Sequence, residues 1–465
     1  MIDPHQMTAT QLLAAYRDRR LSPLDAAEAL VRHVERWEPH LNALYDFRPQ
    51  AFLASARASS ERWARGEPRG ALDGVPVTLK ELIATRGQPV PSGTGLGDQS
   101  PAADDAPPAA RLVEDGATLL GKTTCPDFGM LSSGLSSFHG LTRNPWRLEC
   151  NTGGSSSGAG AAAAAGYGPL HVGTDIGGSV RLPAAWCGTV GFKPTLGRIP
   201  IDPYYVGRCA GPMTRSVDDA ALMMTALSRT DRRDATRLPP EDIDWRDLDL
   251  DVSGLRIGVM MEAGCGLPLD DAIAAAVEAA AARLEAAGAT LVPLAPVMTR
   301  EMLDGLDRFW RVRQWNALSA LSNEQRERVL PAILAWADDG GRIGGGEAVR
   351  GFEQTLAMRR ATEAVFDDLD AVISPTTPNV AFPADWPSPS NDPRRPFEHI
   401  VYTVPWNMGE QPALSLNAGF SRDGMPLGVQ LIGPRLADHF VLKLAKVLET
   451  RLALAPSWPS PPAAQ

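Results

Sequence analysis

The residues best suited to covalent chemistry lie in a glycine-rich segment. Residues 173–181 read GTDIGGSVR, which places Ser179 directly after Gly177 and Gly178. Glycines leave room for successive backbone N–H groups to converge on one point, as in an anion-binding nest. A serine at the end of such a turn can attack a carbonyl carbon while the N–H groups stabilise the oxyanion. A plain glycine-rich turn has the same sequence, so the segment alone leaves both interpretations open.

A serine nucleophile needs a base. None of the 7 histidines stands in a recognisable triad context, and His171, upstream of Ser179, fits a packed strand residue equally well. A Ser–Lys arrangement is the known alternative. Lys80 is the best candidate because it ends an apolar, strand-like segment on the face opposite Val75 and Val77. Most lysines are nevertheless solvated, and that alternative stands beside the catalytic one.

A second serine-rich run, GGSSSG over residues 153–158, precedes small residues that continue to Ala165. A helix beginning here would point its free N–H groups into the loop. A serine cap on an alanine-rich helix is the structural alternative. The run also satisfies G-x-S-x-G with Ser156 at its centre, the pattern of a nucleophile elbow. Residues 149–152 do not resemble a buried strand, however, and no triad partners follow, so the elbow is disfavoured.

The elements that position these residues alternate between strands and helices. The βαβ pattern over residues 255–294 predicts an α/β protein with a partly parallel sheet covered by helices. No linker divides the chain, so we expect one large domain. Further expectations are helices near Leu12 and after Ser22-Pro23, a strand at 75–79, a helix at 107–116, strands at 117–120 and 170–172, a loop at 129–158, a strand at 255–260, a helix at 270–287, a strand at 290–294, helices through 295–365 with a break at 340–346, strands at 371–374 and 427–432, a helix at 438–452 and a loose Pro-rich tail.

Composition excludes several classes of protein. The 465 residues carry a formal net charge of -10, which argues against a nucleic-acid-binding role. Gly 43 and Pro 40 stay below the share typical of low-complexity chains. No signal peptide or membrane span is visible, so we expect a cytoplasmic protein. An odd number of widely spaced cysteines fits that compartment and argues against a disulfide framework or a zinc site; they are Cys125, Cys150, Cys187, Cys209 and Cys265.

Several runs of this sequence resemble the amidase signature family. They are GVPVTLKEL (74–82), GATLLGKTT (116–124), TRNPW (142–146), GGSSSGAG (153–160), GTDIGGSVRLPA (173–184), GFKPTLGRI (191–199), GPMTRSVDDAA (211–221) and GMPLGVQLIG (424–433). The resemblance covers most of the chain and is weak over about 235–400. It implies the family's α/β fold, a single large domain with a mixed, mostly parallel sheet covered on both faces by helices.

The resemblance also assigns roles to residues. It implies a Ser-Ser-Lys triad with Ser179 as nucleophile, Ser155 as bridging serine and Lys80 as base, acting through an acyl-enzyme. We further predict a depressed pKa for Lys80 and a cis peptide bond between Gly154 and Ser155.

The backbone N–H groups of Ile176, Gly177 and Gly178, with that of Ser179, are expected to form the oxyanion hole. We place substrate contacts at Met130, Leu131 and Ser132 and in the variable region 295–400. The sequence departs from the family pattern at Ala163 and His171, which lie off the triad, and at residues 407–413, where we expect an altered wall of the pocket.

The resemblance implies one amidase domain over residues 1–465, hydrolysing a linear carboxylic amide. Its parts would be N-terminal helices (1–70), a core with the catalytic motifs (71–235), a variable substrate region (236–400), a C-terminal core (401–455) and a loose tail (456–465). It implies a small-molecule amide substrate, no metal ion or organic cofactor, no nucleic acid and no membrane, and it allows a homodimer. Two alternatives stay open: the glutaminase component of a tRNA-dependent amidotransferase, favoured by Met130, Ser132 and Ser133, and a catalytically silent scaffold.

Overall fold

The computed structural model describes residues 3–96 and 99–462, and within them eleven strands form one continuous sheet. The strand order is β1-β3-β2-β8-β10-β9-β14-β15-β13-β11-β12. The strands are β1 (Leu44–Tyr45), β2 (Pro76–Lys80), β3 (Thr118–Thr123), β8 (Leu170–Asp175), β9 (Val190–Lys193), β10 (Cys209–Thr214), β11 (Arg256–Val259), β12 (Thr290–Pro293), β13 (Ala371–Pro375), β14 (Ala413–Phe420) and β15 (Pro426–Ile432). Because segments from both halves of the chain share this sheet, the predicted single α/β domain is confirmed.

The sheet is mixed, as predicted, and its parallel pairings fall into two groups. β2 pairs in parallel with β3 and β8, and β11 pairs in parallel with β12 and β13. The strands between these groups, β10, β9, β14 and β15, pair antiparallel. The predicted βαβ unit over residues 255–294 is therefore present as β11, a helix and β12.

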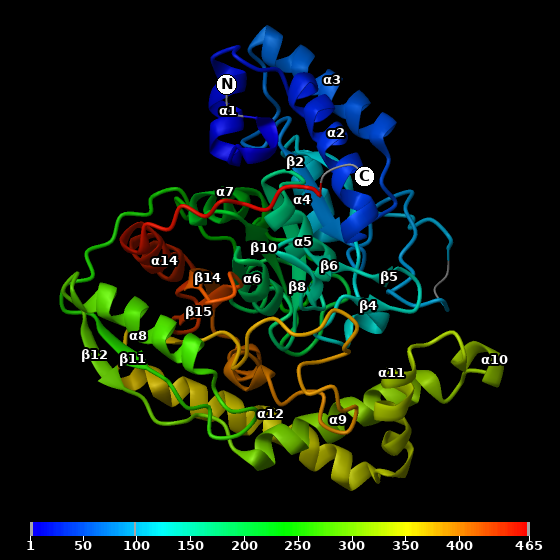
Figure 1. Ribbon diagram of the computed structural model, residues 1–465, viewed down its shortest axis with the longest axis vertical. Coiled ribbons are helices and arrows are strands. Elements are labelled where there is room, and N and C mark those ends of the chain that lie inside the picture. The colour runs from blue at the N-terminus through cyan, green and yellow to red at the C-terminus, as the bar shows by residue number, and fades with distance from the viewer. Residues whose placement is uncertain (1–2, 97–98, 463–465) are drawn as a thin grey trace.

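Helices cover both faces of this sheet (Figure 1). They are α1 (Ala9–Arg17), α2 (Pro23–Leu41), α3 (Pro49–Arg65), α4 (Pro107–Glu114), α5 (Ser157–Ala165), α6 (Arg181–Cys187), α7 (Val217–Leu227), α8 (Asp271–Glu285), α9 (Arg300–Leu318), α10 (Asn323–Arg326), α11 (Pro331–Ala337), α12 (Gly345–Ala364), α13 (Val404–Met408) and α14 (Asp438–Leu452). The helices α9, α11 and α12 lie together along the bottom of this view. None of the described helices is long and apolar enough to cross a membrane.

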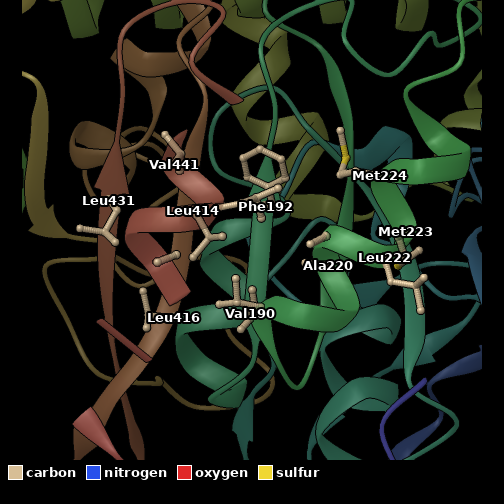
Figure 2. Packing of buried hydrophobic residues seen from close by; sticks show 14 of the residues in the cluster. Val190, Phe192, Ala220, Leu222, Met223, Met224, Leu414, Leu416, Leu431 and Val441 are labelled. Atoms are coloured by element: carbon tan, nitrogen blue, oxygen red, sulfur yellow. The ribbon is translucent and has the colours of Figure 1, made fainter. Parts of the chain in front are cut away.

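The core divides according to the alternation of side chains along the strands. On one face, Leu414 and Leu431 join side chains of α4, α7, α8 and α14 in the largest apolar cluster (Figure 2). The neighbouring positions Ala413 and Ile432 belong to a cluster on the other face, which includes side chains of α6, α9 and α13. Lys80 follows Leu79 of the first face and therefore points to the second.

Local capping signals set several helix boundaries. Ser22 caps α2, accepting a hydrogen bond from the N–H of Asp25, and Pro23 occupies the first helical position, as predicted. Asp270 caps α8 through the N–H of Ala272. The helix α14 spans the predicted residues. These ends need only local side chains, which explains why the sequence predicts them well.

Three expectations need correction. The predicted loop 129–158 contains short antiparallel pairs, β4 (Leu135–Ser136) with β5 (Gly140–Leu141) and β6 (Arg143–Asn144) with β7 (Arg147–Asn151). Ser156 precedes α5 without a side-chain capping bond, because its hydroxyl is engaged elsewhere. The predicted loose tail is anchored at Trp458, whose ring packs on Trp146 and lies 4.4 Å from the guanidinium of Arg215.

Candidate active site

Lys80 ends strand β2 with a completely buried side chain. Its Nζ lies 2.8 Å from Ser155 Oγ, 3.2 Å from Ser156 Oγ and 3.0 Å from Thr174 Oγ1. Burial lowers the pKa of Lys80 to about 8, because removing the ammonium from water disfavours its charged form. The structure therefore shows a lysine surrounded by hydroxyl groups that can lose its proton near neutral pH.

Ser155 lies in the loop before α5, and close packing fixes this loop. A Cβ at Gly154 would lie 2.6 Å from both the N and the O of Ser133, so only glycine fits here. The Gly154–Ser155 peptide bond is cis, as predicted. Ser155 is 3% exposed and its hydroxyl contacts Lys80.

Ser179 lies in the turn that joins β8 to α6. Gly178 has φ +122°, and a Cβ there would lie 2.5 Å from Thr403 Oγ1, so the turn requires glycine. The N–H of Ser156 donates to the backbone oxygen of Ser179 at 3.2 Å, which ties the two serine-bearing segments together. Ser155 and Ser179 line one cavity of about 330 Å³. Their hydroxyls share that cavity without a mutual hydrogen bond among the described residues.

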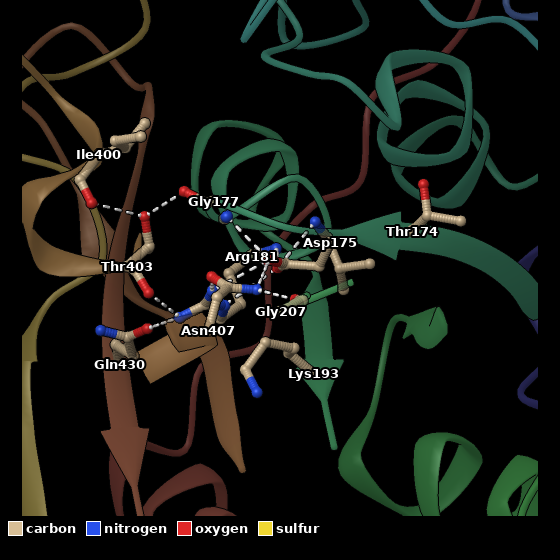
Figure 3. A network of polar contacts seen from close by, with 12 residues as sticks. Thr174, Asp175, Gly177, Arg181, Lys193, Gly207, Ile400, Thr403, Asn407 and Gln430 are labelled. Atoms are coloured by element: carbon tan, nitrogen blue, oxygen red, sulfur yellow. Dashed lines mark hydrogen bonds and ion pairs between the residues drawn. The ribbon is translucent and has the colours of Figure 1, made fainter. Parts of the chain in front are cut away.

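A buried ion pair holds the Ser179 turn in place (Figure 3). Arg181 Nη2 lies 3.0 Å from Asp175 Oδ1, and both side chains are fully buried. Asn407 Nδ2 donates to Asp175 Oδ1 at 2.9 Å, and Arg181 also donates to Gln430. Burial alone would raise the pKa of Asp175, but the charge and hydrogen bonds of Arg181 hold it well below its usual range. This network anchors the turn to β15 and α13.

The same network corrects one predicted oxyanion donor. The N–H of Gly178 donates to Asp175 Oδ1 at 2.8 Å, so this group is already engaged. The N–H groups of Ile176, Gly177 and Ser179 donate no hydrogen bond within the described parts of the chain. These three groups, rather than the predicted set containing Gly178, are the ones available to an oxyanion.

The predicted substrate contacts lie beside Ser179. Met130, Leu131 and Ser132 line a narrow pocket of about 30 Å³ that also includes Ser179 and Ile176. The structure thus brings the segment after β3 together with the β8–α6 turn, as the sequence predicts.

Sequence reasoning did not name several residues of the cavity. Trp310 and Arg313 of α9 line the narrow pocket with Phe397 and Ile400. The rings of Trp310 and Phe397 pack edge to face at 5.1 Å. The spacing of Trp310 and Arg313 by one helical turn is the one available signal, and it is shared by many residues that line nothing. Tyr205 and Arg208 line the wide cavity, and no sequence motif identifies them.

The competing interpretations of the serines and histidines can now be judged. Ser156 is fully buried, and its Oγ lies 3.2 Å from Lys80 Nζ. The same Oγ lies 3.2 Å from the backbone N and 3.2 Å from the backbone O of Thr174. It therefore supports Lys80 and faces neither cavity in front of Ser179. His171 is a packed strand residue, bonded to Thr78 Oγ1 at 2.8 Å and Gly168 O at 3.0 Å, and burial lowers its pKa to about 3.

Comparison with known proteins agrees with this fold. The family model described as Amidase matches residues 25–442, so the chain belongs to the amidase signature family. It is 33% identical to one component of a glutamyl-tRNA(Gln) amidotransferase from Chloroflexus aggregans, over 96% of both chains. It is 32% identical to an acylamidase from Rhodococcus erythropolis, over 96% of this chain and 95% of that one.

Two solved structures are also similar. A bacterial aryl acylamidase of the amidase signature family superposes with a TM-score of 0.88 at 28% identity, over 96% of both chains. A 6-aminohexanoate cyclic dimer hydrolase superposes with a TM-score of 0.89 at 27% identity, over 99% of both chains.

Proposed function

We propose that this protein hydrolyses the C–N bond of a small-molecule carboxylic amide, with Ser179, Ser155 and Lys80 as its catalytic triad. One observation supports this most strongly. The Nζ of a buried lysine whose pKa is about 8 contacts Ser155, and Ser155 shares a cavity with Ser179. A purely structural role requires neither a desolvated lysine nor two serines in front of it.

In the proposed reaction, the lone pair of neutral Lys80 takes the proton of Ser155, which takes that of Ser179. The Ser179 Oγ attacks the amide carbon, and the N–H groups of Ile176, Gly177 and Ser179 stabilise the oxyanion. When the intermediate collapses, the C–N bond breaks and the amine leaves with a proton returned through Ser155. Water then attacks the acyl-enzyme by the same relay, releasing the acid and restoring the Ser179 hydroxyl.

The alternative activity is glutamine hydrolysis within an amidotransferase, because some of the similar relatives are amidotransferase components. The narrow pocket beside Ser179 favours the first proposal, since Leu131, Trp310, Phe397 and Ile400 line it with apolar surface. Glutamine carries a charged ammonium group, and the lining of this pocket contains no carboxylate that could bind it. Release of ammonia from glutamine by the isolated chain, at rates exceeding those on all other amides, would favour the amidotransferase role.

The experiment is a hydrolysis screen over aliphatic, aryl and peptide amides and glutamine, with purified Ser179→Ala protein as the blank. We expect the wild type to release amine from at least one amide and the variant to release none. Trapping an acyl adduct on Ser179 by mass spectrometry would support the covalent route. Equal rates for the wild type and the folded variant would remove Ser179 from the mechanism and favour the silent scaffold.

A further inference from the structure

Two arginines line the wide cavity in front of Ser179. Arg208 stands immediately before β10, and Arg313 lies on α9. The cavity lining contains one carboxylate, Asp175, which is already bound by Arg181 and by backbone N–H groups. Within the described residues, neither Arg208 nor Arg313 forms an ion pair; Asp202 acts on Arg208 only through its field. The cavity therefore presents uncompensated positive charge although the chain as a whole carries -10.

Both guanidinium groups are held by the segment that forms one wall of the cavity. Arg208 Nη1 donates to Pro203 O at 2.7 Å, and the Arg313 guanidinium lies 4.3 Å from the centre of the Tyr205 ring. A guanidinium has five N–H donors, so most of them stay available to a ligand. Burial and the charge of Arg313 lower the pKa of Arg208 to about 10. Guanidinium groups carry a positive charge in proteins, so an anion between the two side chains would relieve their repulsion.

Ser179 lines both the narrow pocket, whose surface is mostly apolar, and this basic cavity, and Arg313 lies at the boundary because it lines both. An amide bound at Ser179 has an acyl part and an amine part on either side of its C–N bond. One part would lie in the narrow pocket and the other in the basic cavity. We propose that the enzyme selects amides that carry a carboxylate, with the carboxylate between Arg208 and Arg313 and an apolar group in the narrow pocket. This inference rests on the proposed amide hydrolysis and names its substrate class.

Binding to the Ser179→Ala protein tests the inference without requiring turnover. Two matched pairs of amides differ in charge: glutaranilic acid with pentananilide, and N-benzoyl-β-alanine with N-propylbenzamide. In the first pair the carboxylate is on the acyl part, and in the second it is on the amine part. We expect calorimetry to show about tenfold tighter binding of the acid in at least one pair, since charge-assisted hydrogen bonds are strong. That pair then identifies which part of the substrate faces the arginines.

Adding Arg208→Gln or Arg313→Gln should abolish that preference by weakening binding of the acid about tenfold. Arg422→Gln, at an exposed position outside the cavity lining, is the matched control and should leave the preference intact. Equal binding within both pairs, or a preference that survives both arginine variants, would overturn the inference whatever the hydrolysis rates. A clear preference for acids in a wild-type protein that hydrolyses no amide would instead count against the proposed function.

Discussion

Residues 151–201 and residues 300–364 both contribute to the cavity in front of Ser179, yet they are built differently. In the first region every residue is buried except Ile176, which is partly exposed. The second region consists largely of α9, α11 and α12, whose outer faces are exposed; in α12 four residues are buried, Gly351, Thr355, Met358 and Thr362. One region is enclosed by the rest of the protein, whereas the other forms an outer layer.

This difference in burial separates two functions, catalysis and the choice of substrate. Burial lowers the pKa of a lysine and allows it to serve as a base near neutral pH, and the enclosed region buries Lys80 in this way. The outer layer contributes two residues of α9 to the cavity lining, Trp310, which is buried, and Arg313, which is exposed. Its surface can change without disturbing the buried surroundings of Lys80, so we expect chemistry to depend on the first region and substrate choice on the second.

The largest expected effect is that of Ser179→Ala. Removing the nucleophile should lower kcat/KM by about 10⁴-fold or more, while the oxyanion donors and the fold remain. Activity is measured on the best amide from the screen, and circular dichroism checks the fold. Ser156→Ala is the matched control in the same enclosed region and should retain far more activity. A nearly inactive Ser156→Ala beside an active Ser179→Ala would restore the elbow interpretation.

The next effect concerns Lys80. Lys80→Ala should lower kcat by about 10²–10⁴-fold, the usual contribution of a general base. Lys80→Arg should not rescue activity, because a guanidinium stays protonated at every working pH. A Lys80→Arg protein with near-normal rates would remove Lys80 from the mechanism.

The pH dependence of the wild type follows from the same lysine. The base must be neutral to accept a proton, so kcat/KM should be low below the pKa of Lys80, rise through about pH 8 and level off above it. A profile that falls with rising pH over this range would contradict the assignment. Because the shift in the pKa of Lys80 arises from burial, this profile reports the enclosed surroundings of that lysine.

One ion pair in each region allows their contributions to the free energy of unfolding to be compared. Arg181→Met leaves Asp175 as an unpaired buried charge and should lower the free energy of unfolding by about 3–5 kcal/mol. Arg342 pairs with Asp339 at 3.1 Å in the outer layer, but its side chain is 86% exposed. Arg342→Met should therefore change stability by less than about 1 kcal/mol. Urea unfolding of both variants measures this, and similar losses would show that the enclosed region is not specially dependent on its ion pair.

The parts of the fold that the sequence predicts are those with local causes. Ser22-Pro23 begins α2 and Asp270 caps α8, because the groups that satisfy each helix end are adjacent in the chain. The anchoring of Trp458 depends on Trp146 and Arg215, which are distant in sequence. A Pro-rich composition suggests a loose tail, but it does not reveal that a distant partner exists.

In the candidate site, too, the sequence predicts what has a local cause and misses contacts between distant segments. Lys80, Ser155 and Ser179 stand in motifs, and the structure brings the segments that carry them together. The engagement of the Gly178 N–H depends on how the Asp175 side chain folds back onto the turn, which the letters GTDIGGS do not specify. Arg208 and Arg313 become neighbours only when α9 packs against the segment before β10, so no spacing in the sequence reports them.

The smallest expected effect distinguishes substrate choice from fold stability between two residues of one loop, Met130 and Ser133. Met130 lines both cavities, so Met130→Ala should change relative rates between amides by about tenfold and lower stability by less than about 1 kcal/mol. Ser133 is buried, and its hydroxyl donates to Trp386 O at 2.7 Å and accepts from Asn151 Nδ2 at 2.8 Å. Ser133→Ala should instead cost about 1–3 kcal/mol of stability and affect all amides equally. Hydrolysis rates on two amides and the thermal unfolding midpoint are measured for each variant. An equal loss of rate on every amide in Met130→Ala would show that Met130 supports the fold and does not determine substrate choice.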